Sequence, residues 1–360
     1  MAKADAVILG GGIIGTSLAD ALARRNLRVV VIERGKIGAE SSSAAAGILS
    51  AQMDVPKPGR FFDLCQLSRR MYPSWVARLE HLTGQPTGFK RSGVLYLAAS
   101  EAQEKRMRKR ASWQSRLGLK VEHWSMRQIR RHEPAVDGRF RCGFHFPLEG
   151  EVDNVLLMRA LAISCLKSGV VLKEETTAQR LVIRKNTVAG VETSHGHWDS
   201  PVVVNTTGSW AGISPFPVRL PIEPARGQIV SFAGPKRLFR RPIMSDGAYI
   251  VQRQDGQLLL GSTIERVGFD KSLTVRGMHD ILCGARKISS RLDNCAFIDS
   301  WAGLRPYSRT GYPILGPTEI HGVFVAAGHF RHGILLAPVT ASLMAQLILH
   351  GHCSFDLTFD

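Results

Sequence analysis

One segment near the start of the chain, AVILGGGIIGTSLADALARRNLRVVVIERG at residues 6–35, constrains the fold more than any other. The apolar runs 7–9 and 27–32 predict two buried strands. Between them, apolar residues at positions 14, 18, 21 and 22 recur at helical spacing. The segment therefore predicts a strand, a helix and a second strand, which is the repeating unit of an α/β protein.

Three glycines and one acid in this unit predict a dinucleotide site. Gly10, Gly12 and Gly15 form the pattern GxGxxG where the helix should begin, and Glu33 ends the second strand about twenty residues later. Such glycines let the backbone approach a pyrophosphate, and a helix N-terminus stabilises its charge. Glu33 can accept hydrogen bonds from ribose hydroxyls. It disfavours a 2′-phosphate, although Arg34 softens that effect. The alternative is a glycine-rich turn in some other α/β protein.

Three later segments suggest that the ligand is long. The small residues SSSAAAG at 41–47 can cap a helix, bind phosphate or lie flat against a planar ligand, and the alternative is a flexible linker. The segments 201–211 and 323–338 each read as a buried strand that leads into a turn of small residues. Pro338 is tolerated only near a helix start, so the loop 328–333 should lie at a helix N-terminus. Three such junctions fit a ligand held by both ends of the chain.

Composition limits the class of protein. The chain has 360 residues, an ordinary share of apolar and charged residues, and a net charge of +17. Basic residues cluster at 104–116, 127–132 and 239–241, which would suit a nucleic acid or an anionic membrane, or simply solvated helix faces. No nucleic-acid motif accompanies them, so we expect neither a nucleic-acid partner nor stable membrane association.

The cysteines and the first residues of the chain indicate where in the cell the protein is expected. The six cysteines show no CxxC pattern, so we expect no metal site and a reducing, cytoplasmic environment. The first residues carry no signal-peptide pattern, and no apolar run approaches membrane-spanning length.

Four motifs together carry a family resemblance. The stretches GGGIIG, SSSAAAG, WAGLRP (301–306) and AAGHFRHGILLAP (326–338) resemble the FAD-dependent D-amino acid oxidase superfamily, and within it the glycine oxidase family. The resemblance implies a Rossmann-like FAD-binding α/β domain, interleaved with an α+β substrate domain built on a large antiparallel sheet. It assigns residues 1–90, 145–220 and 301–360 to the FAD-binding domain. Residues 91–144 and 221–300 form the substrate-binding domain.

The resemblance also implies site residues. Arg305, Tyr249 and Arg331 would face the substrate: an arginine can grip an amino-acid carboxylate with two parallel hydrogen bonds, and no acid lies near Arg305 or Arg331 in sequence. The alternative for Arg305 is an ion pair with a distant acid. The expected FAD contacts are Gly10, Gly12, Ile13, Ile14, Gly15, Glu33, Arg34, Ser41, Ser42, Ala46, Gly47, Ile48, Ala178, Thr207, Gly208, His329, Phe330, Arg331, His332, Gly333, Ile334 and Leu335.

The activity implied is oxidative deamination of glycine, sarcosine or small D-amino acids by dioxygen, which gives an imine and hydrogen peroxide. Thiamine biosynthesis would use the imine, and a homotetramer is the implied assembly. FAD should be non-covalent, because the C-terminal loop has no cysteine. Gly247 and Ile264 depart from the histidine and methionine common in glycine oxidases, which leaves the preferred substrate open. A quinone-coupled D-amino acid dehydrogenase and a non-catalytic FAD-binding protein remain as alternatives.

Overall fold

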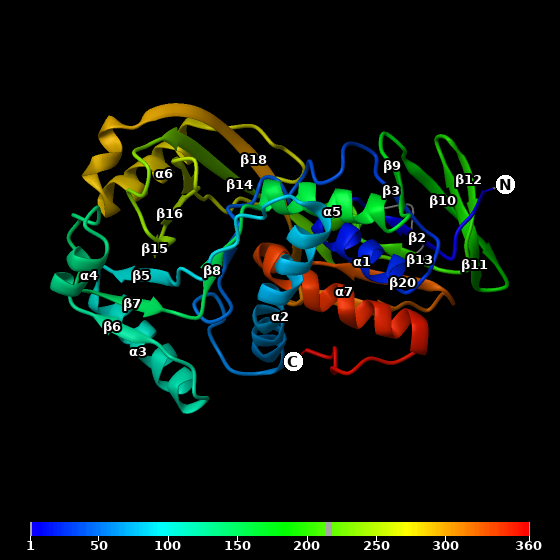
Figure 1. Ribbon diagram of the computed structural model, residues 1–360, viewed down its shortest axis with the longest axis horizontal. Helices are drawn as coiled ribbons and strands as arrows, with labels where there is room; N and C mark the ends of the chain where they lie inside the picture. Colours follow the sequence, from blue (N-terminus) through cyan, green and yellow to red (C-terminus); the bar gives the residue numbers. More distant parts are fainter. Residues whose placement is uncertain (1, 214–217, 360) are drawn as a thin grey trace.

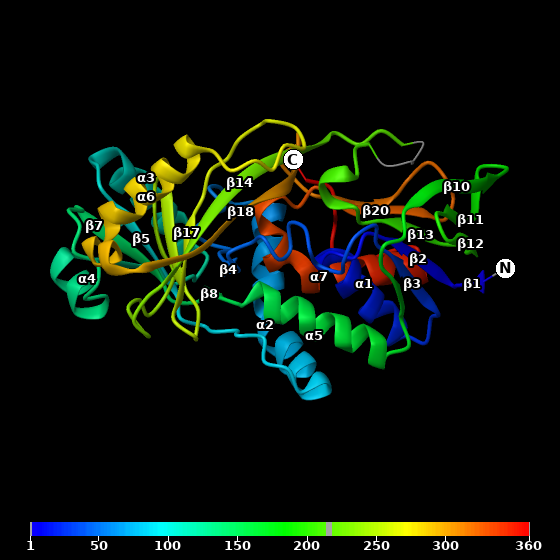
Figure 2. The ribbon, with the colours of Figure 1, turned by 90° about the horizontal axis from the view of Figure 1, so that it is seen from above.

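A computed structural model of the chain describes residues 2–213 and 218–359. The molecule is elongated, and its two largest sheets occupy opposite ends in both ribbon views (Figures 1 and 2). One sheet is mostly parallel and the other is mostly antiparallel. The predicted mixed α/β architecture is therefore confirmed.

The mostly parallel sheet has six strands in the order β19-β20-β13-β2-β3-β9. Every neighbouring pair is parallel except β19 and β20. Along β2, Ala6 and Ile8 face a helical layer, whereas Val7 and Leu9 face a second sheet. This burial on both faces explains the continuous apolar run in the sequence. The strands are β2 (Ala6–Leu9), β3 (Val29–Ile32), β9 (Val171–Lys173), β13 (Val203–Asn205), β19 (Ile314–Pro317) and β20 (Val323–Ala327).

Four helices cover one face of this sheet: α1 (Ile13–Ala23), α2 (Arg60–Thr83), α5 (Asn154–Lys167) and α7 (Gly333–His350). Helix α7 packs against α1 and α2. In the described part of the chain, only the helical segment Phe330–His350 has the length and apolar composition of a membrane span. Most of that segment is buried within the molecule, so packing in the core accounts for its apolar sequence. Pro338 lies in the second turn of α7, close to the helix start, as predicted.

A smaller sheet covers the opposite face, in the order β1-β12-β11-β10. Its strands are β1 (Ala2–Lys3), β10 (Ala178–Arg184), β11 (Thr187–Thr193) and β12 (Gly196–Asp199). Strands β10 and β11 form an antiparallel hairpin. Two short strands, β4 (Ile48–Leu49) and β8 (Gly150–Glu151), form a separate antiparallel pair.

The mostly antiparallel sheet has eight strands in the order β18-β14-β17-β16-β15-β5-β7-β6, and only β15 and β5 are parallel. Its longest strands, β14 (Ile222–Ala233) and β18 (Ala296–Ser308), pair along almost their whole length. The others are β5 (Val94–Ala98), β6 (Glu122–Trp124), β7 (Cys142–Phe146), β15 (Ile243–Ser245), β16 (Ala248–Gln252) and β17 (Gln257–Gly261). Helices α3 (Glu101–Arg116), α4 (Met126–His132) and α6 (Val275–Ile288) pack against it.

Two of the predicted domain boundaries fall inside strands of this sheet. The boundary at 144/145 lies within β7, and the boundary at 300/301 lies within β18. Because a continuous strand cannot divide between two sheets, residues 145–146 and 301–308 stay with the antiparallel sheet. The chain therefore leaves this sheet a few residues later than the sequence suggests.

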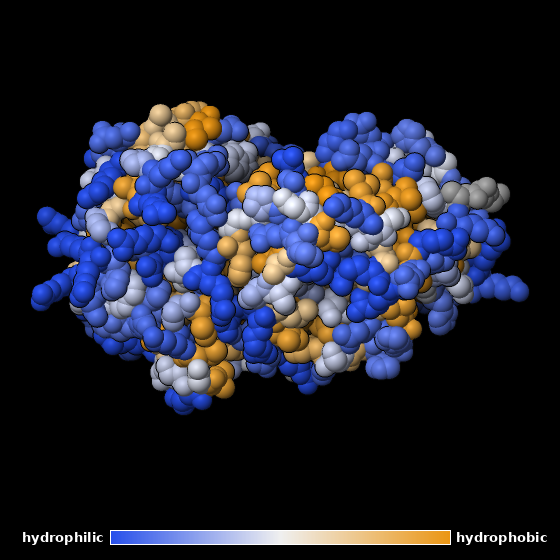
Figure 3. Space-filling view, viewed as in Figure 1, coloured by the Kyte–Doolittle hydropathy of each residue, from blue (hydrophilic) through white to orange (hydrophobic). Residues whose placement is uncertain are grey.

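The basic segments 104–116 and 127–132 lie on or beside α3 and α4, at the end of the molecule away from the parallel sheet (Figure 1). Hydrophilic side chains cover much of that end in the space-filling view (Figure 3). Some of the charge is neutralised locally, because Arg106 pairs with Asp246 and Arg108 pairs with Glu104. Arg110 is half-buried, and the other basic side chains of the two segments are exposed to solvent, as expected for solvated helix faces.

Candidate active site

A cavity of about 590 Å³ lies where the two large sheets meet. The carboxyl ends of β2, β13 and β20 open into it, and these three parallel strands are neighbours in the sheet. In such sheets, ligands bind beyond the carboxyl ends of the strands. The three junctions of small residues predicted from the sequence therefore converge on one site.

Most of the predicted site residues line this cavity. They are Gly10, Gly12, Ile13, Ile14, Glu33, Arg34, Ser41, Ser42, Ala46, Gly47, Ile48, Ala178, Thr207, Gly208, Tyr249, Arg305, His329, Phe330, Arg331, Gly333 and Ile334. Three predicted residues, Gly15, His332 and Leu335, are not among the lining residues.

The glycines at the start of α1 have distinct tasks. Gly10 has a φ of 103°, and a Cβ there would meet the carbonyl oxygen of Thr206 at 2.6 Å. A Cβ on Gly15 would overlap the carbonyl of Gly10 and the hydroxyl of Thr206. Gly15 thus permits close packing of the helix on the strands, whereas Gly10 and Gly12 face the cavity.

Glu33 is held by the backbone rather than by a side chain. Its carboxylate accepts hydrogen bonds from the amides of Gly11, at 2.8 Å, and Gly35, at 2.9 Å. These bonds fix the acid at the end of β3, where it lines the cavity. Beside it, the Arg34 guanidinium lies 3.7 Å from the ring centroid of Trp210, and Trp210 stacks on Phe269.

The small residues at 41–48 pass between the two sheets. The Ser42 hydroxyl accepts a 2.9 Å hydrogen bond from the amide of Ile13 and so caps the start of α1. Gly47 has a φ of 74°, and a Cβ there would overlap the carbonyl of Val152. The segment is therefore packed tightly against its neighbours, and the alternative of a flexible linker is wrong.

The loop between β20 and α7 presents its backbone to the cavity. Phe330 has a φ of 50°, which is uncommon for a residue with a side chain. The His329 ring nitrogen Nε2 lies 3.1 Å from the Thr340 hydroxyl, and burial lowers its pKa to about 3. His332 turns away from the cavity, edge-on to Phe61, and burial lowers its pKa to about 4. Both imidazoles are neutral at pH 7.

Leu335 contributes to the core instead of the cavity wall. Its side chain is buried among the helices, and its carbonyl accepts a 2.6 Å hydrogen bond from the Ser68 hydroxyl of α2. The neighbouring carbonyl of Ile334 accepts a 2.8 Å hydrogen bond from Tyr72. Helix α2 thereby fixes the first turn of α7, which faces the cavity through Gly333 and Ile334.

Arg331 has an acidic neighbour that is distant in sequence. Its Nη1 lies 4.0 Å from Oδ1 of Asp54, and both residues line the cavity. The Arg331 side chain is also 44% exposed, which places it at the cavity mouth. The absence of an acid near Arg331 in sequence therefore did not mean the absence of one in space.

Arg305 is positioned by hydrogen bonds alone. Its Nη1 donates to the carbonyl of Thr263 at 3.0 Å, and its Nη2 donates to the hydroxyl of Ser262 at 2.8 Å. Among residues 2–213 and 218–359, no carboxylate lies within ion-pair distance of this guanidinium, so the alternative of a distant acidic partner is not found. Burial lowers its pKa, yet arginine stays charged at neutral pH. A half-buried cation without an acidic partner favours an anionic ligand.

Two glycines make room for the substrate-facing side chains. A Cβ on Gly227 of β14 would overlap the Arg305 guanidinium, and a Cβ on Gly261 of β17 would overlap the Tyr249 phenol. Tyr249 and Gly261 are direct partners across β16 and β17. Burial raises the pKa of Tyr249, so its hydroxyl keeps its proton at neutral pH.

Several cavity residues were not predicted from the sequence. They include Ala44, Asp54, Thr176, Thr206, Trp210, Gly227, Ile229, Met244, Ser262, Gly303 and Pro306. A signal existed for Gly227 and Gly303, because a glycine inside a long strand marks a close approach of another group. The others carry no such signal in one sequence, since strand register decides their neighbours.

The residues present fit FAD. The cavity combines a glycine cradle that a Cβ would close, a helix N-terminus, an acid beyond β3 and an open wall of small side chains. Glu33 would bind the ribose and the start of α1 the pyrophosphate. The segment 44–48 and the loop 329–334 would hold the flavin ring. A dinucleotide without a broad ring system would leave the segment 44–48 and the loop 329–334 without a ligand to contact.

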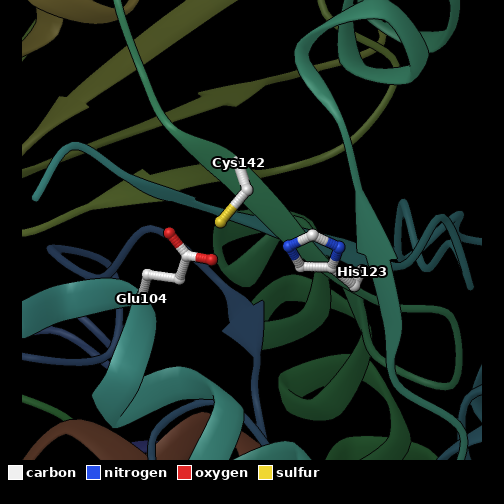
Figure 4. A group of neighbouring side chains, drawn as sticks. All are labelled: Glu104, His123 and Cys142. Carbon is white, nitrogen blue, oxygen red and sulfur yellow. The ribbon is translucent and has the colours of Figure 1, made fainter. Parts of the chain in front are cut away.

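A separate group of side chains contains three metal-ligand types: Glu104, His123 and Cys142 point toward one another (Figure 4). Two arginines already occupy this group. Arg108 bonds the Glu104 carboxylate at 2.7 Å and lies 3.1 Å from Nε2 of His123, and Arg141 bonds the other carboxylate oxygen at 3.0 Å. The two guanidiniums neutralise the acid and oppose a cation, so we do not assign a metal site here.

Comparisons with known proteins agree with this geometry. The chain is 31% identical to a glycine oxidase of Geobacillus kaustophilus, over 98% of this chain and 95% of that protein. A crystal structure of glycine oxidase from the same species superposes with a TM-score of 0.95 at 30% identity, covering 99% of this chain and 98% of that one. The bifunctional protein ThiO/ThiG of Trichormus variabilis is 33% identical over 96% of this chain, but the chain spans only 52% of that relative's length.

The family assignment rests on most of the chain. Residues 5–347 match a single protein family, described as FAD dependent oxidoreductase, which covers both large sheets and every wall of the cavity. The predicted FAD cofactor and enzymatic class are therefore confirmed. This chain is an enzyme of the DAO family of FAD-dependent oxidoreductases.

Proposed function

We propose that this enzyme oxidatively deaminates glycine and other small amines, such as sarcosine and small D-amino acids. Dioxygen is the electron acceptor and is reduced to hydrogen peroxide. The imine product hydrolyses to glyoxylate and ammonia, or methylamine when sarcosine is the substrate. The observation that carries this proposal is the unpaired Arg305 guanidinium beside the Tyr249 hydroxyl in the cavity.

The chain's own residues bind and orient the substrate. Arg305 would bind the carboxylate through two parallel hydrogen bonds, and Tyr249 would donate a third. Bound FAD supplies the acceptor for the hydride from the substrate Cα. No side chain needs to act as a nucleophile, and the neutral His329 and His332 supply no acid. Orientation and the positive end of α7 then carry the catalysis.

The backbone at the start of α7 also has an electrostatic task. His329, Phe330, Arg331, Gly333 and Ile334 line the cavity at the start of α7, so amides of a helix N-terminus would face the ligand there. Such amides stabilise negative charge that develops on a ligand during reaction. Arg331 adds positive potential at the mouth, tempered by Asp54.

The pathway proposal follows from the relatives. Both the glycine oxidases and the ThiO part of the bifunctional ThiO/ThiG proteins align over nearly the whole chain. We infer that the imine feeds thiazole formation in thiamine biosynthesis. The six cysteines are free, which is compatible with the cytoplasmic location that we also propose. We further propose the two-domain division, with an FAD-binding part around the parallel sheet and a substrate part around the antiparallel sheet.

Assembly into a homo-oligomer, expected as a tetramer, is likewise proposed. Strand β18 is an edge of the eight-stranded sheet, and its first residues include the exposed Phe297 and Ile298. Exposed apolar edges of this kind favour pairing with another chain. Light scattering on the purified protein tests this proposal, and Phe297→Asp should lower the oligomer mass.

A peroxide-coupled assay with glycine, sarcosine and D-alanine tests the proposed reaction directly. Peroxide formation in air together with flavin bleaching under anaerobic conditions is the expected result. Bleaching without peroxide would instead support a quinone-coupled dehydrogenase, and the absence of bleaching by all three amines would support a non-catalytic FAD-binding protein. Acid precipitation should release the yellow chromophore, because the FAD is expected to be non-covalent.

A further inference from the structure

The hydroxyl of Ser262 lies between the two groups that would bind the substrate carboxylate. Its Oγ accepts a 2.8 Å hydrogen bond from Nη2 of Arg305. Tyr249 lies directly across the sheet from Gly261, the residue before Ser262, so the serine is next to the phenol as well as to the guanidinium. A hydrogen bond with the Ser262 side chain lowers the pKa of Tyr249 against the effect of burial.

The directions of these hydrogen bonds form one chain. Arg305 can only donate, so Ser262 must accept from it. The single hydroxyl proton of Ser262 is then free to be donated to the Tyr249 oxygen. The Tyr249 hydroxyl then keeps its own proton for donation to a ligand. Tyr249 and Arg305 both line the cavity in which that ligand would bind. Successive hydrogen bonds of this kind polarise one another, which strengthens the last donor.

The sheet holds all three side chains in register. Tyr249 lies across Gly261, the residue before Ser262, and Arg305 reaches from β18 across Gly227 of β14 to the end of β17. The Thr263 carbonyl fixes the other guanidinium nitrogen, and the Thr263 hydroxyl is itself bonded to Glu265 at 2.6 Å. Ser262 thus bonds to both the arginine and the tyrosine.

We propose that Ser262 is a positioning residue for substrate recognition: its hydroxyl orients Arg305 and directs the Tyr249 proton toward the substrate carboxylate. This inference rests on the proposed function. Ser262 need not touch the substrate to act in this way. In a variant without the Ser262 hydroxyl, Nη2 of Arg305 loses its acceptor and the Tyr249 oxygen loses its donor. Both side chains are then less fixed in orientation when the substrate binds.

The experiment compares Ser262→Ala with Ser231→Ala in the FAD-loaded enzyme. Ser231 is a buried serine of β14 that bonds Gln257 at 2.8 Å and does not line the cavity, so it controls for the loss of a hydroxyl from the same sheet. Acetate serves as the probe, because it carries a carboxylate and no amine. Its dissociation constant is measured from the perturbation of the flavin absorption spectrum, and KM and kcat are measured with glycine.

In S262A, the dissociation constant of acetate and the KM for glycine should each rise about tenfold, as expected for the loss of one hydrogen bond to a charged group. The value of kcat should change less than twofold. S231A should match the wild type in its dissociation constant for acetate, its KM and its kcat. Ser262→Thr keeps the hydroxyl and should recover most of the affinity. Equal affinities in S262A and the wild type, or an equal loss in S262A and S262T, would overturn the inference.

If the proposed function is wrong, the wild-type enzyme should give a different result. In that case the wild-type enzyme itself neither binds acetate nor oxidises glycine, although it carries FAD. That outcome would overturn both proposals, whereas a wild type that binds acetate no more tightly than S262A overturns only the role of Ser262.

Discussion

The Arg305 guanidinium lies directly over Gly227, and any side chain at position 227 would occupy the space of its nitrogens. The two residues belong to neighbouring strands, since Gly227 is in β14 and Arg305 is in β18. An arginine normally extends away from a sheet. Here the missing Cβ lets it lie along the sheet surface and reach Ser262 and Thr263 two strands away.

Replacement of Gly227 by alanine should therefore displace Arg305. We expect the KM for glycine to rise at least about tenfold, because the guanidinium loses its fixed orientation toward a carboxylate. FAD content should stay unchanged, since Gly227 lies outside the glycine loop. The control is Gly234→Ala just beyond the far end of β14, where the new Cβ meets the flexible Leu258 side chain at 2.6 Å and the Cys295 Sγ at an ordinary contact distance of 3.4 Å. A normal KM in G227A would contradict the assigned position of Arg305.

Removal of the guanidinium itself should have a larger effect. Arg305→Ala is expected to reduce kcat/KM for glycine about 30- to 1,000-fold, which corresponds to about 2–4 kcal/mol of lost binding to a desolvated carboxylate. Arg309→Ala removes an exposed arginine just beyond β18 and should change kcat/KM less than twofold. An unchanged KM in R305A would remove the main support for a carboxylate substrate.

The start of the fold could be predicted from the sequence because its signals are local. The spacing of Gly10, Gly12, Gly15 and Glu33 is set by one strand, one turn and one helix, and it holds in the structure. The hairpins β10–β11 and β16–β17 are local in the same way, because each turn lies between two short apolar runs. The extent of the antiparallel sheet is not local, because nothing in the sequence shows that β18 continues from Ala296 to Ser308.

The candidate site was predicted in part for the same reason. Arg305 and Tyr249 came from motif resemblance, and local chemistry alone did not distinguish Tyr249 from an ordinary strand aromatic. Ser262, Gly227 and Asp54 were missed, since each meets its partner only through the register of non-neighbouring strands or loops. Sequence spacing cannot supply that register when no homologous sequence is compared.

Gly15 should be required for folding around the cofactor, not for contact with it. A Cβ at this position overlaps the Gly10 carbonyl, so Gly15→Ala should push α1 away from β2 and lower both FAD content and thermal stability of the apoprotein. Gly12→Ala offers a contrast, because its Cβ would meet only the Ser42 hydroxyl at 3.2 Å and would face the cavity. G12A should lose FAD with little loss of apoprotein melting temperature. If both variants melted alike, the separate roles of the two glycines would be refuted.

The buried carboxyl group of Glu149 should make the folding stability of the protein depend on pH. Its side chain is buried, one carboxylate oxygen accepts the amides of Gln52 and Met53, and the other has no hydrogen-bond partner among the described residues. Burial raises its pKa from 4.5 to about 8, and the charge of Asp54 adds to this effect. The folded protein therefore keeps a proton that the unfolded chain releases. Folding stability should fall as pH rises from about 4.5 to about 8 and should then level off.

Glu149→Gln removes this titration while keeping the oxygen that accepts both amides. Relative to the wild type, the free energy of unfolding of E149Q should increase with pH between 5 and 8, and the difference should be constant above pH 8.5 or so. Urea unfolding of the FAD-loaded proteins at four pH values measures this difference. Glu151, whose pKa burial raises to about 7, remains in both proteins and cancels in the comparison. A difference that does not vary with pH would mean that Glu149 is ionised in the folded protein, with its charge balanced by Arg69.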